Sequence, residues 1–153
     1  MQTFAQITEF TVDNAEGIAI HYEVIDQIAK TVQVGNGSSA AINTGTIGAV
    51  TIPETVYDEN GVRYTVTEIA DVAFKKCSKL PGINIPGSVE KIGEEAFTKC
   101  KKLVSVEIPP AVTEISASAF ENCGALSFVR IHAGVTQIDA EAFIDIGNDD
   151  INT

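Results

Sequence analysis

Residues 89–111 read VEKIGEEAFTKCKKLVSVEIPPA, and residues 112–134 read VTEISASAFENCGALSFVRIHAG. Both follow the pattern V-x-x-I-x-x-x-A-F-x-x-C-x-x-L-x-x-V-x-I-P, except that His132 replaces the final proline. The same residue types recur at a spacing of 23 residues over successive units. The main sets are Val66, Val89, Val112 and Val135; Ile69, Ile92, Ile115 and Ile138; Phe74, Phe97, Phe120 and Phe143; Cys77, Cys100 and Cys123; and Leu80, Leu103 and Leu126. A fixed period of this length predicts a repeat solenoid.

Each unit is expected to supply two short extended segments and one corner. Segment 103–108 alternates as a strand does, and the prolines at 109–110 end it. Segment 112–115 is a second extended piece on another wall of the coil, and segment 117–123 is predicted to form a helical turn. Four residues stand at the entry of this turn, three of them acceptable helix N-caps: Ala70, Gly93, Ser116 and Asp139. Because one unit cannot bury its own apolar side, the units must stack into ladders of like side chains.

The three cysteines, Cys77, Cys100 and Cys123, occupy one repeat position, so stacking places them in a column. Such a column is either a metal or redox site or a set of small buried core residues. Ile146 holds the equivalent place in the last unit, which favours simple burial. An odd number of cysteines also argues against a closed disulfide framework, and we expect no bridges.

Residues 1–65 lack the period and are predicted to form an N-terminal β-rich capping region with a divergent first repeat. Alternation predicts strands at 10–12, 17–25 and 31–34, and Asn60-Gly61 predicts a hairpin turn. The segment 49–53, AVTIP, resembles the strand and proline of the repeat. The Gly- and Ser-containing stretch at 35–39 lacks the spaced residues of a phosphate-binding loop and is interpreted as a turn.

The predicted organisation is therefore a cap at 1–65, repeats of 23 residues at 66–147 and a polar C-terminal tail at 148–153. The repeats comprise three full units and a fourth that stops before its Leu-x-x-Val-x-Ile strand. Because a solenoid needs a cap at each end, either the tail closes the stack or the natural chain continues with further units.

The composition limits the possible partners. The chain of 153 residues carries a formal charge of −11, so it repels phosphate backbones, and we predict no nucleic-acid partner. No apolar run approaches the roughly 18–20 residues that span a bilayer, so we predict no membrane insertion. The N-terminal ten residues show no signal peptide, which leaves either an intracellular protein or a segment of a secreted one.

The two quoted units resemble BspA-type leucine-rich repeats, and residues 17–77 resemble the N-terminal cap of that family. The resemblance covers roughly residues 10–147. It implies an α/β repeat solenoid: a right-handed, curved coil of short strands and helical turns with a β-rich cap. It also implies an extracellular or cell-surface protein, because members are commonly bacterial surface or secreted proteins, several of them linked to adhesion. The missing proline at His132 and the short fourth unit depart from the family pattern.

No catalytic, cofactor-binding or metal-binding residue is predicted. The chain lacks the Gly-x-Ser-x-Gly, His-Glu-x-x-His and Cys-x-x-Cys motifs. A catalytic site on the cap would need His21 or Glu23 beside a nucleophile, and the sequence indicates no such arrangement. We therefore predict that the protein is not an enzyme.

Two surfaces are candidates for partner binding. On the outer face of the repeat strands, alternation directs five side chains away from the core: Asn84, Ser105, Glu107, Phe128 and Arg130. An exposed aromatic beside an arginine is typical of binding hot spots, although Phe128 could also be an isolated exposed residue or be covered by the tail. At the corner, the period stacks two pairs of lysines: Lys76 with Lys99, and Lys79 with Lys102. This basic strip predicts either an anionic partner or no more than solubility.

Together these features predict a non-catalytic surface or secreted module that binds a protein or glycan, such as a host matrix or cell-surface protein. The alternative is a structural cap-and-stalk segment of a larger repeat protein. Such a segment would extend, or form a homo-oligomer, through its C-terminal edge, because unpaired strand edges favour pairing with another chain.

Overall fold

The computed structural model describes residues 6–147, and the predicted tail lies outside this range. Within it the chain forms strands and turns and contains no helix. The strands of the cap and its junction are β1 (Glu9–Asp13), β2 (Ala19–Asp26), β3 (Thr31–Val34), β4 (Val50–Thr51), β5 (Thr55–Tyr57) and β6 (Arg63–Ile69). Those of the repeats are β7 (Ile83–Asn84), β8 (Lys91–Ile92), β9 (Ser105–Glu107), β10 (Glu114–Ile115), β11 (Phe128–Arg130) and β12 (Gln137–Ile138).

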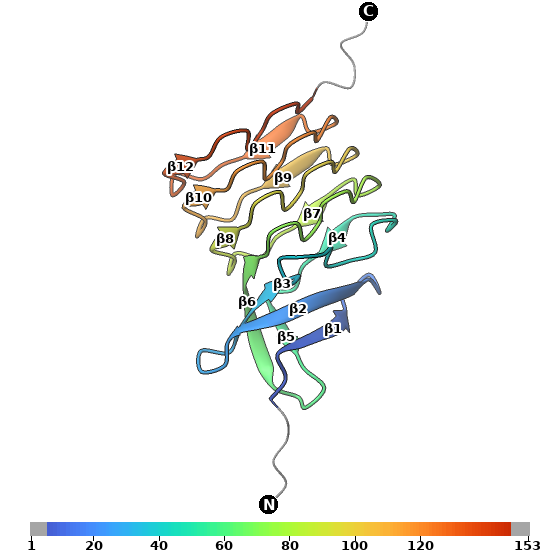
Figure 1. Cartoon of the computed structure of the whole chain (residues 1–153), viewed down its shortest axis with the longest axis vertical. Helices are drawn as coiled ribbons and strands as arrows, with labels where there is room; N and C mark the ends of the chain where they lie inside the picture. Colours follow the sequence, from blue (N-terminus) through green and yellow to red (C-terminus); the bar gives the residue numbers. More distant parts are fainter. Residues whose placement is uncertain (1–5, 148–153) are drawn as a thin grey trace, which may run out of the picture.

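The repeats stack as successive coils with a strand ladder on each of two walls (Figure 1). One wall continues the cap sheet in the order β1-β2-β3-β6-β8-β10-β12, with β5 paired to β6. On the other wall β4 pairs with β7 and β9 with β11, and a Gly82–Ser105 bridge connects the two pairs. Ile115 lies opposite Ile92 and Ile138, so the coils are in register by one period. The two predicted extended segments per unit are confirmed.

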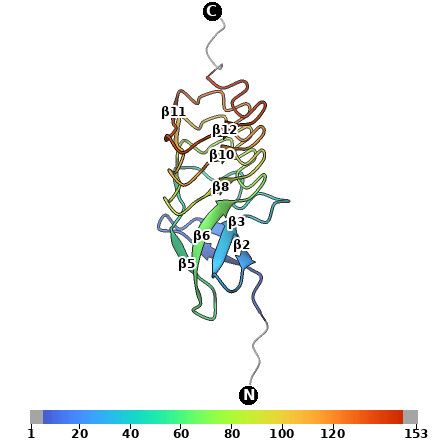
Figure 2. The ribbon, with the colours of Figure 1, turned by 90° about the vertical axis from the view of Figure 1, so that its left-hand side faces the viewer.

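The predicted helical turns are wrong. In the corner of the first unit, Val72 and Lys76 have positive φ angles of 55° and 63°, which ends any right-handed helix. The N–H groups of Ala73, Lys75 and Cys77 close tight turns onto the carbonyl three residues earlier. The alternate N–H groups donate to the next coil: Val72 to Glu94, Phe74 to Ala96 and Lys76 to Thr98, at 2.7–3.0 Å. The corner is thus a chain of linked turns bonded to the adjacent coil (Figure 2).

The residues at the corner entry do not act as helix N-caps. The Ser116 hydroxyl donates to the carbonyl of Ile92 in the preceding coil at 2.7 Å. Asp139 accepts a hydrogen bond from the Gln137 amide instead of capping a turn. At Gly93 a Cβ atom would lie 2.5 Å from the backbone nitrogen of Asp71, so the position has room only for glycine. The sequence preference at this position therefore reflects contacts between coils.

The core of the solenoid consists of the predicted ladders. The rings of Phe74, Phe97, Phe120 and Phe143 stack in parallel, with centroids 5.0–5.3 Å apart and interplanar angles of 2–4°. The first three rings are completely buried, as are Leu80, Leu103 and the isoleucines of β6, β8 and β10. Such stacking adds aromatic contact to the hydrophobic burial of each ring.

The cysteine column is buried and lies within this core. Cys77, Cys100 and Cys123 have no exposed surface and form no disulfide. The thiols of Cys100 and Cys123 each donate to the carbonyl of the phenylalanine one coil earlier, Phe74 and Phe97, at 3.1 Å. Burial raises the pKa of the Cys77 thiol to about 11, and the adjacent Cys123 thiol together with burial raises that of Cys100. The thiols of Cys100 and Cys123 therefore link neighbouring coils by hydrogen bonds.

The cap is a β-sheet, and the predicted strands lie within one or two residues of the observed ones. Asp58 organises the hairpin: its carboxylate accepts from the N–H groups of Asn60 and Val62 at 2.9 Å. Strand β6 runs across the predicted boundary at residue 65 without a break, so cap and repeats share one sheet. On the wall that does not contain β6, Val50 of β4 pairs with Ile83 of β7, so the divergent first repeat is in register with the strands of that wall.

The C-terminal coil leaves the ladders open in the described part of the chain. Ile138 is 51% exposed, whereas Ile69, Ile92 and Ile115, its equivalents in the earlier coils, are fully buried. Phe143 and Ile146 are only partly buried. The stack is thus covered at its N-terminal end by the cap sheet and uncovered at the other.

The phenylalanine ladder gives the first prediction. Phe97→Ala removes a ring packed on both faces and should lower the free energy of unfolding by about 3–5 kcal/mol. Phe128→Ala is the matched control: that ring is 61% exposed, and its loss should cost about 0.5 kcal/mol or less. Urea unfolding followed by circular dichroism measures both values, and equal losses would contradict the ladder.

Candidate binding surfaces

The first surface is the outer face of β7, β9 and β11, here called the ladder face. It comprises the five predicted residues Asn84, Ser105, Glu107, Phe128 and Arg130, and all five are exposed. Phe128 lies opposite Ser105, and Arg130 lies opposite Glu107 in the parallel pair of β9 and β11. The structure therefore brings these side chains together on one rigid wall, as the alternation predicts.

Glu107 is the central charge of the ladder face. Its carboxylate lies 3.9 Å from the Arg130 guanidinium and 3.1 Å from the His132 ring. Exposed pairs of this kind contribute little to stability, because water screens them and the side chains lose freedom. Their effect is to hold the arginine and the carboxylate side by side, so that the face presents both charges at fixed positions.

Two features of the ladder face were not predicted. Val104, the residue before β9, is 48% exposed, so an exposed apolar residue precedes Ser105 in the chain. A hollow of about 250 Å³ lies between the β7 and β9 segments, lined by Asn84, Glu107 and the prolines at 109–110, among others. Val104 occupies a variable repeat position, where the period alone gives no signal.

The second surface is the lysine corner, which comprises Lys76, Lys79, Lys99 and Lys102. All four are exposed, and in the described part of the chain none lies within 4.0 Å of a carboxylate oxygen. The neighbouring Lys75, by contrast, is paired with Glu95. Lys76 and Lys99 occupy the same turn position, with φ angles of 63° and 64°. The next two coils place Asn122 and Asp145 there, so the basic strip is confined to two coils.

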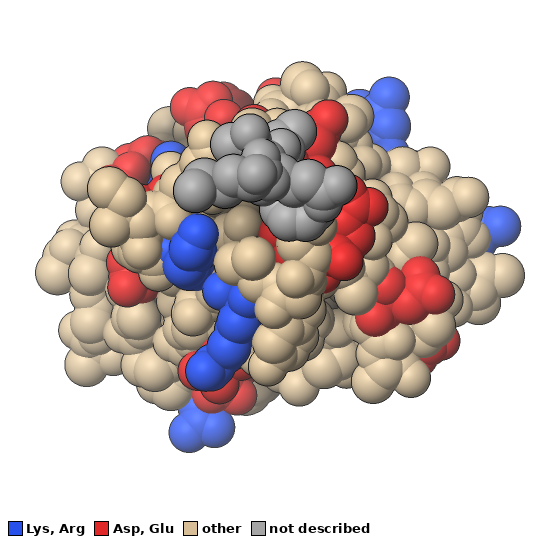
Figure 3. Space-filling model, turned by 90° about the horizontal axis from the view of Figure 1, so that it is seen from below, with Lys and Arg blue, Asp and Glu red and all other residues tan. Residues whose placement is uncertain are grey.

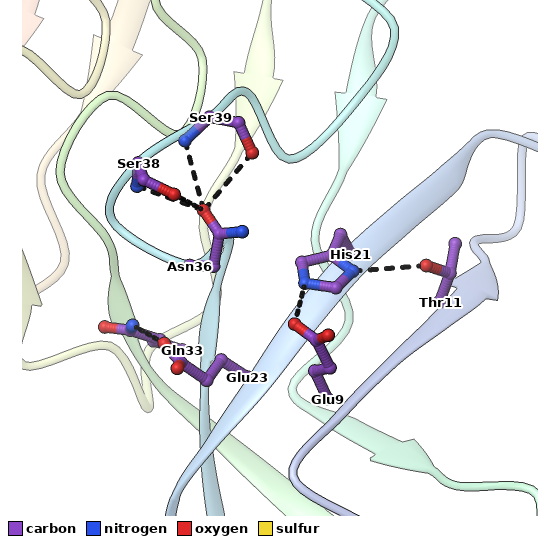
Figure 4. A network of polar contacts seen from close by, with 8 residues as sticks. All are labelled: Glu9, Thr11, His21, Glu23, Gln33, Asn36, Ser38 and Ser39. Carbon is purple, nitrogen blue, oxygen red and sulfur yellow. Dashed lines mark hydrogen bonds and ion pairs between the residues drawn. The ribbon is translucent and has the colours of Figure 1, made fainter.

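The cap loop adds hydroxyl groups beside this corner. Lys76 borders a hollow of about 310 Å³ that is also lined by Ser38, Ser39 and Thr44. The loop is a turn, as predicted: the Asn36 side chain accepts hydrogen bonds from the N–H groups of Ser38 and Ser39 (Figure 4). Cationic and hydroxyl groups therefore adjoin here, a combination that suits an anionic or sugar-like ligand.

One polar cluster on the cap brings together residues that the sequence did not associate. His21 lies between Glu9, 3.2 Å from its Nε2 atom, and the Thr11 hydroxyl, 3.3 Å from its Nδ1 atom (Figure 4). A hydroxyl thus lies beside His21, a neighbour that the sequence did not indicate. Hydrolase triads place the nucleophile at Nε2 and the carboxylate at Nδ1, the reverse of this order. Since Thr11 lies directly opposite His21 in β1 and β2, the cluster is a set of cross-strand contacts.

Residues 6–147 contain no group of three or more His, Cys, Asp or Glu side chains that could hold a metal ion. They also include no helix of the length and apolarity that a membrane crossing requires. The charged groups of the two surfaces instead lie at the exterior of a stacked core.

Known proteins share the repeats and the fold of this chain. A family model described as the BspA type leucine-rich repeat region matches residues 54–148 in six copies. The chain belongs to the BspA-type leucine-rich repeat family. A comparison with curated protein sequences gives no match. Members of such a repeat family generally serve as binding modules, and the family resemblance of the sequence is confirmed.

Solved leucine-rich repeat structures share the fold. A protein from Bacteroides capillosus is 30% identical, with 92% of this chain and 94% of that chain covered and a TM-score of 0.69. One from Bacteroides ovatus is 32% identical over 83% of this chain but only 32% of its own, with a TM-score of 0.73. The T. pallidum protein TpLRR is 22% identical over 84% of this chain and 65% of its own, with a TM-score of 0.66, and shows the fold alone. The chain thus spans about a third of the Bacteroides ovatus protein.

The buried thiols give the second prediction. At pH 8 the native protein should react with iodoacetamide far more slowly than a free cysteine does, because burial blocks access and the raised pKa of Cys77 keeps its thiol protonated. Addition of urea through the unfolding transition should expose all three sites together. Mass spectrometry of the labelled protein measures this, and rapid labelling of one cysteine in the folded protein would contradict the buried column.

Proposed function

We propose that the protein is a non-catalytic binding module, displayed at the cell surface or secreted, that binds a protein partner through its ladder face. The observation that carries this proposal is the exposed Phe128 ring beside the Arg130–Glu107 pair. Aromatic and arginine side chains contribute most of the binding energy in many interfaces, provided that the surrounding contacts exclude water. Val104 and the hollow beside Asn84 provide such surrounding contacts.

The scaffold supports this role because the ladder face is built on strands. Four of its residues lie on β9 and β11, which pair in parallel, and the fully buried Leu103 and Ile108 flank β9. A partner therefore meets backbone positions that are already ordered, and binding costs little loss of backbone freedom. The remaining cost is the ordering of a few exposed side chains.

The lysine corner supports an additional contact with an anionic group, such as an acidic protein patch or a charged glycan of a host surface. Four cations without close carboxylates concentrate positive potential on an otherwise acidic protein. Display outside the cell is proposed from the family, because its members are commonly surface or secreted proteins.

The exposed C-terminal coil favours a second candidate function, a stalk segment that extends or self-associates. The ladder residues Ile138 and Phe143 are uncovered in the described range, although their equivalents are buried in every earlier coil. Another coil, from a continued chain or from a second copy, would bury them and pair with β12. Under this reading the ladder face would be a continuous wall in a longer structure.

The third prediction tests the binding role. The full chain is screened against immobilised extracellular matrix proteins and a glycan array, and any ligand found is titrated with variants. Phe128→Ala should weaken binding to a protein ligand about tenfold or more, because it removes the central aromatic contact. Ile28→Ala is the matched control: it truncates a 95% exposed apolar residue on the cap and should leave binding unchanged. Absence of any ligand across the panel would count against adhesion.

The fourth prediction tests the stalk. Light scattering over a range of concentrations should show association if the open coil binds a second copy, and Ile138→Lys should abolish it by placing a charge on the exposed ladder. Ile28→Lys adds the same charge at the cap end and should leave association intact. A monomer at all concentrations, with an ordered C-terminal tail, would eliminate the self-association alternative.

A further inference from the structure

The cap sheet is rolled so that its two edge strands lie near one another. Its strand order is β1-β2-β3-β6, with β5 as the last strand beyond β6. Phe10 of the first strand nevertheless contacts Tyr64 of the fourth, with ring centroids 5.6 Å apart, as well as Tyr22 of its neighbour at 5.8 Å. The sheet therefore curls around these three rings, and β1 and β5 border the place where the barrel-like roll fails to close.

This opening, here called the seam, is shut at one end and open at the other. At the shut end the Asn14 side chain donates to the Thr51 carbonyl at 3.0 Å, and Glu16 accepts from the Thr51 hydroxyl at 2.6 Å. At the open end a hollow of about 560 Å³ is lined by residues 6–12 on one side and by 57–59 on the other. The strand β1 and the β5 segment thus run in opposite directions and diverge from Thr51.

The backbone of β1 presents unpaired groups to the seam. Val24 donates to the Thr8 carbonyl and Asn14 to the Ile18 carbonyl, at 2.7 and 2.9 Å. Since bonding alternates in an antiparallel pair, the even-numbered residues of β1 bond to β2. The N–H and C=O groups of Glu9, Thr11 and Asp13 consequently point away from β2, and nothing in the described range pairs with them.

The same alternation applies to β5. Val66 donates to the Glu54 carbonyl and Asp58 to the Val62 carbonyl, at 2.9 and 3.0 Å, so these even-numbered positions face β6. The backbone groups of Thr55 and Tyr57 therefore face outward, toward the other border of the seam. Two strand edges with free donors and acceptors adjoin one hollow, which is the geometry that an added strand requires.

The charge of the seam selects the kind of peptide. Glu9, Asp58 and Glu59 line the hollow, and its lining includes no lysine or arginine. The whole segment 6–65 contains eight acidic and two basic residues. Figure 3, which views the molecule from the cap end, shows acidic side chains in several groups and basic ones mostly in one short row.

We propose that the seam binds an extended, lysine- or arginine-bearing peptide segment by strand addition to β1. Backbone groups of the peptide pair with Glu9 and Thr11, which line the open hollow, and its basic side chains lie toward the carboxylates of Glu9 and Glu59. This site is separate from the ladder face, so it is tested independently of the proposed function.

The probe is an eight-residue peptide of alternating lysine and valine with blocked ends, titrated into the isotopically labelled full chain. Saturable amide shifts should centre on Glu9, Thr11 and Tyr57. A peptide of the same sequence with N-methylated lysine backbone nitrogens keeps its charge but loses every second donor, and it should bind at least tenfold more weakly. A peptide with glutamate in place of lysine should not bind.

Matched variants separate backbone pairing from side-chain effects. Thr11→Pro removes an outward N–H without removing a bond to β2, and it should weaken peptide binding about tenfold. Thr11→Val removes the hydroxyl beside His21 but keeps the N–H, and it should leave binding within about twofold. Glu59→Gln should weaken binding several-fold and reduce its salt dependence. Circular dichroism checks that each variant is folded.

The proposal is overturned by absence of binding at millimolar peptide, by equal binding of the N-methylated peptide, by equal effects of the two Thr11 variants, or by shifts centred elsewhere. Binding that requires removal of residues 1–5 would assign the seam to the chain's own N-terminal segment and would equally overturn it. Phe128→Ala should leave peptide binding unchanged, so that loss of ladder-face binding and failure of the seam are distinguishable.

Discussion

Hydrogen bonds between successive coils are the interaction on which the rest of this structure depends. In the corner, every second N–H group donates to the adjacent coil, and the groups between them close tight turns. A coil of this kind cannot satisfy its backbone alone, because half of its corner donors need a neighbour. The phenylalanine, leucine and cysteine ladders follow from the same register, since bonding at a fixed offset places identical side chains in contact.

The hydrogen bonding between coils also explains which features the sequence predicts and which it does not. The period defines which residues stack, because a core position must remain apolar in every coil, and it predicts the buried sets of the earlier coils, whereas Ile138 of the last coil is exposed. The path of the corner was not. Val72, Glu95 and Ser118 adopt positive φ angles although none is glycine, so the sequence carries no turn signal there. Ser116 and Asp139 suggested helix caps, but the Ser116 hydroxyl bonds to the preceding coil and the Asp139 carboxylate accepts from Gln137 of its own coil.

For the binding surfaces, the exposed strand residues were predictable from the sequence, but the hollows beside them were not. Alternation along a strand places Phe128 and Arg130 outward whatever the details of packing, and the structure confirms their exposure. The hollow beside Asn84, the exposed Val104 and the seam depend on how segments far apart in sequence approach one another. The seam in particular arises because the cap sheet rolls around Phe10, a residue that belongs to no repeat.

A stack held by contacts between neighbours has two ends, and in this protein the two ends differ in how their ladder residues are covered. At the N-terminal end β6 belongs both to the cap and to the first coil, so the cap terminates the ladder by continuing its sheet. The cap sheet is rolled, and its edge strands β1 and β5 approach each other but leave the hollow of the seam between them. At the other end the last coil simply stops within the described range, and its ladder residues stay partly exposed. A solenoid must cover both ends of its ladders. The cap that covers the N-terminal end contains the polar seam, and the described part of the C-terminal end exposes an apolar edge.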